Sequence, residues 1–150
     1  MIDRPSRDRL ALGLRQYLSG RIHNDELDGI DVDWRDRGAI AVKESSWCLY
    51  SDHIQHFATG EHAFPAEARR EIARWILFLY SDQEYLWPEY SLVRFENKLA
   101  NLLTLGWWQR REDRRWKEFC ECGDFSCWPF QSHNELKRAL ASPRLLSGSR

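Results

Sequence analysis

The feature that most constrains the fold is the stretch 65–88, which begins and ends with proline. A proline suits the first turn of a helix, where its missing N–H loses no hydrogen bond, and the second proline prevents a simple continuation. Between them Ile72, Ile76 and Leu79 repeat at the spacing of one helical face, and neighbouring apolar residues widen that face. A helix that is apolar on nearly all sides must be wrapped by other elements. The sequence therefore predicts a central, buried helix over 66–81.

The same helical spacing recurs along the chain on both sides of this stretch. We expect further helices over 7–19, 25–30, 38–58, 90–105, 107–119 and 132–141. Five prolines and eight glycines are few for 150 residues, which favours helices over a sheet with many turns. We expect an irregular or short extended segment near 123–131 and a frayed tail over 142–150. The sequence predicts an all-α fold, a single-domain bundle of about six helices spanning residues 1–150.

Composition and charge exclude several classes of function. A net charge of -1 argues against a protein that binds nucleic acid with its whole surface. No apolar run reaches the roughly 18 to 20 residues that span a membrane, and the charged opening residues lack the apolar region of a secretion signal. Four unevenly spaced cysteines indicate reduced thiols. We therefore expect a cytoplasmic protein. Because phosphate-binding and nucleophile motifs are absent from the sequence, we also expect that the protein has no cofactor and is not an enzyme.

Four separated pieces of the chain carry a resemblance to other sequences. They are 10–20 followed by Asn24-Asp25-Glu26, Leu49-Tyr50-Ser51-Asp52 with His56, 73–79 running on through Ser81-Asp82 to Trp87-Pro88, and Gly123-Asp124 with Trp128-Pro129-Phe130. These pieces are scattered over most of the chain, and they resemble a group of small bacterial proteins that have no established activity. The resemblance implies a source in a bacterium or its mobile elements.

The most unusual stretch is 107–117, where aromatic and basic residues interleave. Tryptophan and arginine dominate the hot spots of protein–protein interfaces, so we predict that this stretch contacts a partner protein. The predicted contact residues are Trp107, Trp108, Arg110, Arg111, Arg114, Arg115 and Trp116. The leading hypothesis is a non-enzymatic interaction module that docks a preformed surface on another protein, as an immunity protein or inhibitor does.

Two other interpretations of the stretch 107–117 remain open. Its acidic residues can pair with the arginines along the helix, which would make it a solvated, salt-bridged surface. Basic and aromatic residues together can also bind a nucleic-acid strand or a membrane surface, although the acids in the stretch disfavour both.

A metal site is the rival interpretation from another functional class. Cys120, Cys122, Cys127 and His133 offer the thiolate and imidazole ligands that zinc prefers. Their C-x-C-x4-C spacing differs from the paired C-x2-C of structural zinc sites, so we expect no metal and keep a zinc module or small zinc enzyme as the alternative. A second candidate cluster is His53 and His56 on adjacent turns of the predicted helix, with His62 just beyond it.

Overall fold

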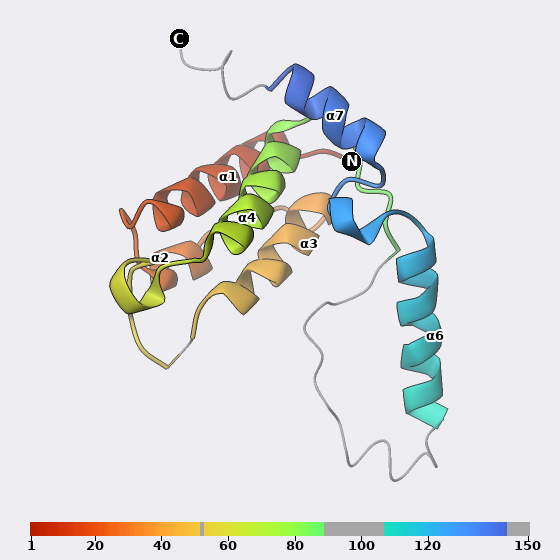
Figure 1. The fold of residues 1–150 in the computed structure, drawn as a ribbon, viewed down its shortest axis with the longest axis horizontal. Helices are drawn as coiled ribbons and strands as arrows, with labels where there is room; N and C mark the ends of the chain where they lie inside the picture. Colours follow the sequence, from red (N-terminus) through yellow and green to blue (C-terminus); the bar gives the residue numbers. More distant parts are fainter. Residues whose placement is uncertain (52, 89–106, 144–150) are drawn as a thin grey trace.

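Figure 1 shows the computed structural model, which describes residues 1–51, 53–88 and 107–143, with the backbone alone at 107–109 and 112. These residues form six α-helices and no strand: α1 (Arg4–Leu18), α2 (Asn24–Asp28), α3 (Arg37–Ser46), α4 (Ala66–Tyr80), α6 (Trp107–Glu121) and α7 (His133–Ala141). Three short 3-10 helices accompany them: η1 (Trp47–Leu49), η2 (Gly60–His62) and η3 (Phe125–Cys127). The predicted all-α, single-domain fold is confirmed. The helix predicted over 90–105 and most of the predicted tail lie outside the described residues.

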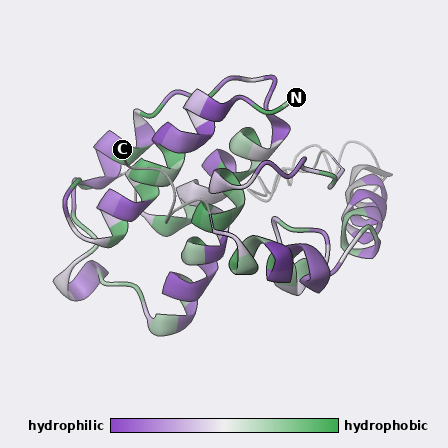
Figure 2. Ribbon diagram, turned by 90° about the horizontal axis from the view of Figure 1, so that it is seen from above, coloured by the Kyte–Doolittle hydropathy of each residue, from purple (hydrophilic) through white to green (hydrophobic). Residues whose placement is uncertain are grey.

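The predicted central helix is α4, and it lies side by side with α1 (Figure 1). Six apolar positions of this helix are buried: Ile72, Trp75, Ile76, Leu77, Phe78 and Leu79. The facing side of α1 contributes Leu10, Leu14 and Tyr17, all with no exposed surface. In Figure 2 the apolar residues gather toward the centre of the group formed by α1, α2, α3 and α4, which we call the body. None of the described helices is both long and apolar enough to cross a membrane.

The C-terminal end of α4 is capped by two arginines from the first turn of α1. The Arg4 guanidinium donates hydrogen bonds to the carbonyl oxygens of Leu79 at 2.9 Å and Tyr80 at 3.1 Å. Arg7 donates to the carbonyl oxygens of Ser81 at 3.3 Å and Gln83 at 2.8 Å. The last carbonyls of a helix have no partner within the helix and carry its negative dipole end, so cationic donors stabilise them. These contacts fix the ends of α1 and α4 relative to each other.

Arg7 also forms the buried ion pair that joins α1 to α3. Its Nε and Nη2 atoms donate to the two carboxylate oxygens of Asp36 at 2.7 and 3.0 Å, and both side chains are only 1% exposed. Asp36 caps α3 as well, because Oδ1 accepts from the amides of Gly38 and Ala39, each at 3.1 Å. The amide of Asp3 donates to Oδ2 at 2.9 Å. A buried charge is tolerated only when it is paired and fully hydrogen-bonded, and this pair meets that condition.

Gly38 lies where no side chain fits between α3 and the ion pair. A Cβ atom at this position would lie 2.8 Å from Arg7 Nη2 and 2.8 Å from Phe78 Cε1. Neither neighbour can move freely, since Arg7 is held by Asp36 and Phe78 lies in the core. We expect Gly38→Ala to lower the free energy of unfolding by about 1–3 kcal/mol, although alanine is the better helix former. Urea denaturation followed by circular dichroism measures the change, and a stabilised variant would contradict this packing.

The helix predicted over 38–58 is wrong in its second half, because α3 ends at Ser46 and η1 at Leu49. The serine hydroxyls at the end of α3 turn back onto the helix: Ser45 Oγ donates to the carbonyl of Ala41 at 2.8 Å, and Ser46 Oγ donates to that of Lys43 at 2.6 Å. Such bonds compete with helix continuation. Ile54 and Phe57, whose spacing fits the apolar face of the predicted helix, are 56% and 45% exposed.

Buried Asn24 holds the segment that leaves α3 against the start of α2. Its Nδ2 donates to the carbonyls of Ser51 at 3.1 Å and Ile54 at 3.0 Å, and its Oδ1 accepts from the amide of His56 at 2.8 Å. The Asn24 amide donates to the carbonyl of His56 at 3.1 Å. One buried side chain thus satisfies backbone groups that a helix would otherwise have paired, so long-range hydrogen bonds replace the predicted helix.

Helix α6 stands apart from the body and is joined to it at its C-terminal end (Figure 1). Four rings make this joint, which we call the aromatic anchor: Trp87, Trp116, Phe119 and Phe125. The Trp87 ring lies 4.8 Å from that of Phe119, and its indole N–H donates to the carbonyl of Pro129 at 3.1 Å. The residues along α6 are mostly hydrophilic (Figure 2). The aromatic anchor therefore positions α6 and the turn that follows it.

Candidate functional site

The turn between α6 and α7 is built around Asp124. Its carboxylate accepts from the amide of Ser126 at 3.0 Å and from the Ser126 hydroxyl at 2.6 Å, which caps η3. Its backbone donates to the carbonyl of Gln131 at 3.0 Å and accepts from the amide of Cys127 at 2.9 Å. The predicted irregular segment near 123–131 is thus a tightly bonded turn that presents Asp124 and Cys127 together.

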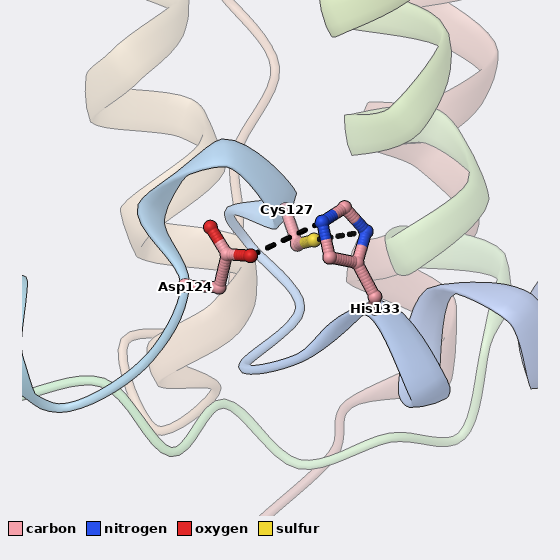
Figure 3. Close-up of side chains that lie close together, drawn as sticks. All are labelled: Asp124, Cys127 and His133. Carbon is pink, nitrogen blue, oxygen red and sulfur yellow. Dashed lines mark hydrogen bonds and ion pairs between the residues drawn. The ribbon is translucent and has the colours of Figure 1, made fainter.

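A chain of three polar side chains crosses this turn (Figure 3). The His133 ring lies between the other two: Nδ1 is 3.0 Å from Cys127 Sγ, and Nε2 is 3.1 Å from Asp124 Oδ2. The Cys127 thiol is fully buried, whereas the His133 and Asp124 side chains are 63% and 45% exposed. The hydrogen bonds from Ser126 lower the pKa of Asp124, and the charge of His133 lowers it further. The carboxylate is therefore ionised at neutral pH and faces the imidazole.

Of the four predicted zinc ligands, the structure brings together two, Cys127 and His133. In the described residues the one cluster of three metal-binding side chains is Asp124, Cys127 and His133, which excludes Cys120 and Cys122. The Cys122 sulfur lies elsewhere, 3.4 Å from Gln131 Nε2 and 3.8 Å from the carbonyl of Leu86. The sequence analysis missed Asp124 as a candidate ligand because it treated 123–131 only as an irregular or short extended segment. The available signal was an acid three residues before a cysteine, in a turn that leads to a capped helix.

His53 and His56 of the second histidine cluster lie outside any described helix, and His62 is the last residue of η2. His56 belongs to the segment that Asn24 holds, and its two ring nitrogens lie 3.2 Å from Tyr17 Oη and 3.0 Å from the carbonyl of Ile54. The rings of His56 and His62 are 4.1 Å apart. Because both nitrogens of His56 already face hydrogen-bonding partners, this histidine serves the local structure.

The predicted contact residues all lie on α6, and the structure describes the side chains of five of them, which form two groups. Arg110, Arg111, Arg114 and Arg115 are exposed. Trp116 is half-buried in the aromatic anchor, stacked on Phe119 with 5.9 Å between the ring centres. Trp107 and Trp108 form the first turn of α6.

A shallow groove of about 730 Å³ lies beside the C-terminal half of α1 and the residues around η2. Three arginines stand along it: Arg15, Arg21 and Arg69. None of the buried polar side chains in the described part of the chain lines this groove. It therefore has basic walls but lacks a buried polar group that would fix a ligand.

No protein-family model, curated protein or solved structure matches this chain. The class of protein that the structure defines is an all-α bundle with a projecting, arginine-rich helix and a thiol–imidazole–carboxylate cluster at the base of that helix.

Proposed function

We propose that this protein is a non-enzymatic interaction module that binds an acidic surface of a partner protein through α6, as an immunity protein or inhibitor binds its target. The single observation that carries the proposal is the exposure of four arginines on a helix that stands apart from the body (Figure 1). Arginine has planar, multidentate hydrogen-bonding geometry and is enriched at interfaces.

Helical geometry gathers these arginines on one side of α6. Arg110 and Arg114 are one turn apart, as are Arg111 and Arg115, and the two pairs occupy neighbouring faces. At about 100° per residue the four span roughly 140° of the helix, and we call this side the arginine strip. Phe119, at the centre of the aromatic anchor, falls outside that arc. The strip is thus turned away from the attachment of α6 to the body.

The body supplies the rigidity that a preformed docking surface needs. Its core is continuous, and its polar contacts are buried and paired at Arg7 and Asp36. Binding through a surface that is already ordered avoids the entropy cost of ordering it at the moment of contact. In this proposal Trp116 positions α6 from within the aromatic anchor rather than contacting the partner.

Under this proposal the protein acts in the cytoplasm of a bacterium. It is encoded by the bacterium or by one of its mobile elements. Four free cysteines support a reducing compartment. Under this proposal the partner is a protein encoded nearby, since immunity proteins and inhibitors act on a specific target.

Charge reversal on the arginine strip tests the proposal. Tagged wild-type protein and the Arg111→Glu/Arg115→Glu variant are used to capture partners from cells of the source organism, and the dissociation constant is then measured with the purified partner. We expect the variant to weaken binding at least ~10-fold, because two cationic anchors become repulsive toward an acidic surface. The melting temperature should stay unchanged, since both positions are exposed.

The matched control is Arg69→Glu/Arg70→Glu, which makes the same change in net charge at exposed positions of α4. This control should retain the affinity of the wild type. Equal losses in the two variants would show that only the overall charge matters and would refute a specific surface. Capture of nucleic acid instead, with an affinity that falls steeply as salt is added, would also refute the proposal.

A further inference from the structure

We propose that Asp124, Cys127 and His133 form a site for one zinc ion at the junction of α6 and α7. The ligand atoms of these three side chains all lie within 4.8 Å of one another (Figure 3). The site is independent of the arginine strip, and it differs from the ligand set that the cysteine spacing suggested.

The donor set matches zinc in its chemistry. A thiolate, an imidazole and a carboxylate are the three side-chain ligands that zinc takes in proteins, and the soft thiolate disfavours magnesium and calcium. Three protein ligands leave the fourth tetrahedral position to water, which is the pattern of an open zinc site. The exposure of Asp124 and His133 gives the ion and its water a path from solvent.

The geometry can reach tetrahedral coordination by small movements. In a tetrahedral zinc site a sulfur and a nitrogen ligand stand about 3.5 Å apart. Cys127 Sγ and His133 Nδ1 are now 3.0 Å apart, so they must separate slightly to admit the ion. Asp124 faces the opposite nitrogen of the ring, so the ring must turn before one of its nitrogens can share an ion with both the sulfur and the carboxylate. His133 is the exposed first residue of α7, where a ring rotation disturbs no core packing.

Further hydrogen bonds hold Asp124 and Cys127 in place, as the groups around a metal site do for its ligands. The Ser126 hydroxyl and amide bind the Asp124 oxygen that does not face His133, which leaves the other oxygen for the ion. The backbone bond from Cys127 to Asp124 fixes the distance between two of the ligands along the chain. Zinc would therefore close the turn that sets the direction of α6 relative to α7.

Zinc titration of metal-free protein tests the site. We expect one zinc ion per chain, measured by competition with a chromogenic chelator, and a rise in melting temperature of about 5–10 °C at 100 times the dissociation constant. Cobalt in place of zinc should give the near-ultraviolet charge-transfer band of a thiolate ligand. Binding should release protons, because the thiol must ionise to coordinate.

Ligand variants assign the ion to these residues. Cys127→Ser and the exposed His133→Ala should each weaken zinc binding at least ~10-fold, the smallest loss expected when a group at a metal site is removed. Cys48→Ser and His53→Ala are the controls, since each removes the same kind of group at an exposed position outside the cluster, and both should bind as the wild type does. Unchanged affinity in His133→Ala, a cobalt spectrum without the thiolate band, or a wild type that binds no zinc at micromolar concentration would each overturn the proposal.

Discussion

Replacing Asp36 by alanine is expected to lower the free energy of unfolding by about 3–5 kcal/mol. The substitution leaves the buried guanidinium of Arg7 without its carboxylate, and an uncompensated charge in the interior is strongly destabilising. It also removes the cap of α3 and the acceptor for the amide of Asp3. Urea denaturation of wild type and variant at neutral pH measures the difference.

The matched control for this prediction is the solvent-accessible pair of Asp33 and Arg35, in which the Asp33 side chain is 19% exposed. Its shortest contact, 2.6 Å, is as close as the buried one, yet the Arg35 side chain is 56% exposed. Because water and counterions screen an exposed pair, Asp33→Ala should cost about 0–1 kcal/mol. Similar losses at Asp33 and Asp36 would show that burial does not set the strength of these pairs and would contradict the interpretation.

The contribution of Asp36 should disappear in acid. Burial raises the pKa of this carboxyl, but the bonds from Arg7 and from the backbone amides outweigh burial and lower the pKa below its usual value. A carboxyl with a lowered pKa in the folded state stabilises the protein above its unfolded pKa of about 3.9, and the stabilisation is lost as pH falls through the folded value. The stability of the wild type should therefore fall below about pH 4, and Asp36→Asn should lack this part of the fall.

Replacing Trp87 by alanine is expected to cost about 3–5 kcal/mol and to release α6 from the body. Trp87 is fully buried, and its ring contacts Phe119 and Phe125 while its N–H binds the carbonyl of Pro129. The substitution leaves a large cavity at the centre of the aromatic anchor. Limited proteolysis should then cut within 107–121 at lower protease concentration than in the wild type, and denaturation should report the loss of stability.

Trp34→Ala is the control, because Trp34 is 80% exposed. It removes the same side chain and should change stability by no more than about 0.5 kcal/mol. If Trp87→Ala lowered stability while α6 kept the protection of the wild type, the aromatic anchor would not be what attaches this helix.

The central helix was predictable because several local signals agree at α4. Its apolar spacing and the proline before it point to a helix over 66–81, and the structure has Ala66–Tyr80. The last helix was equally predictable from the sequence, because Ser132 caps it by accepting a hydrogen bond from the amide of Glu135. These elements depend on interactions between residues that are close in the sequence.

The failures lie where distant residues decide the structure. The predicted helix over 38–58 had the correct period, but Asn24 binds its second half from another element. Arg7 and Asp36 are 29 residues apart, and no local pattern marks them as a buried pair. The cluster of Asp124, Cys127 and His133 combines both cases: Cys127 and His133 were named from their residue types, whereas Asp124 joins them through the folded turn.

The two arginines that cap α4 come from a helix that is synthesised long before it. Arg4 binds carbonyls that lie 75 to 77 residues further along the chain. At ribosomal rates of about 5–20 residues per second, those carbonyls are made roughly 4 to 15 s after Arg4 itself. During this interval the first helix lacks these acceptor carbonyls, although Asp36, the other partner of Arg7, follows it by only 29 residues. Docking of α1 on the end of α4 therefore cannot be completed until residues 79–81 have been translated.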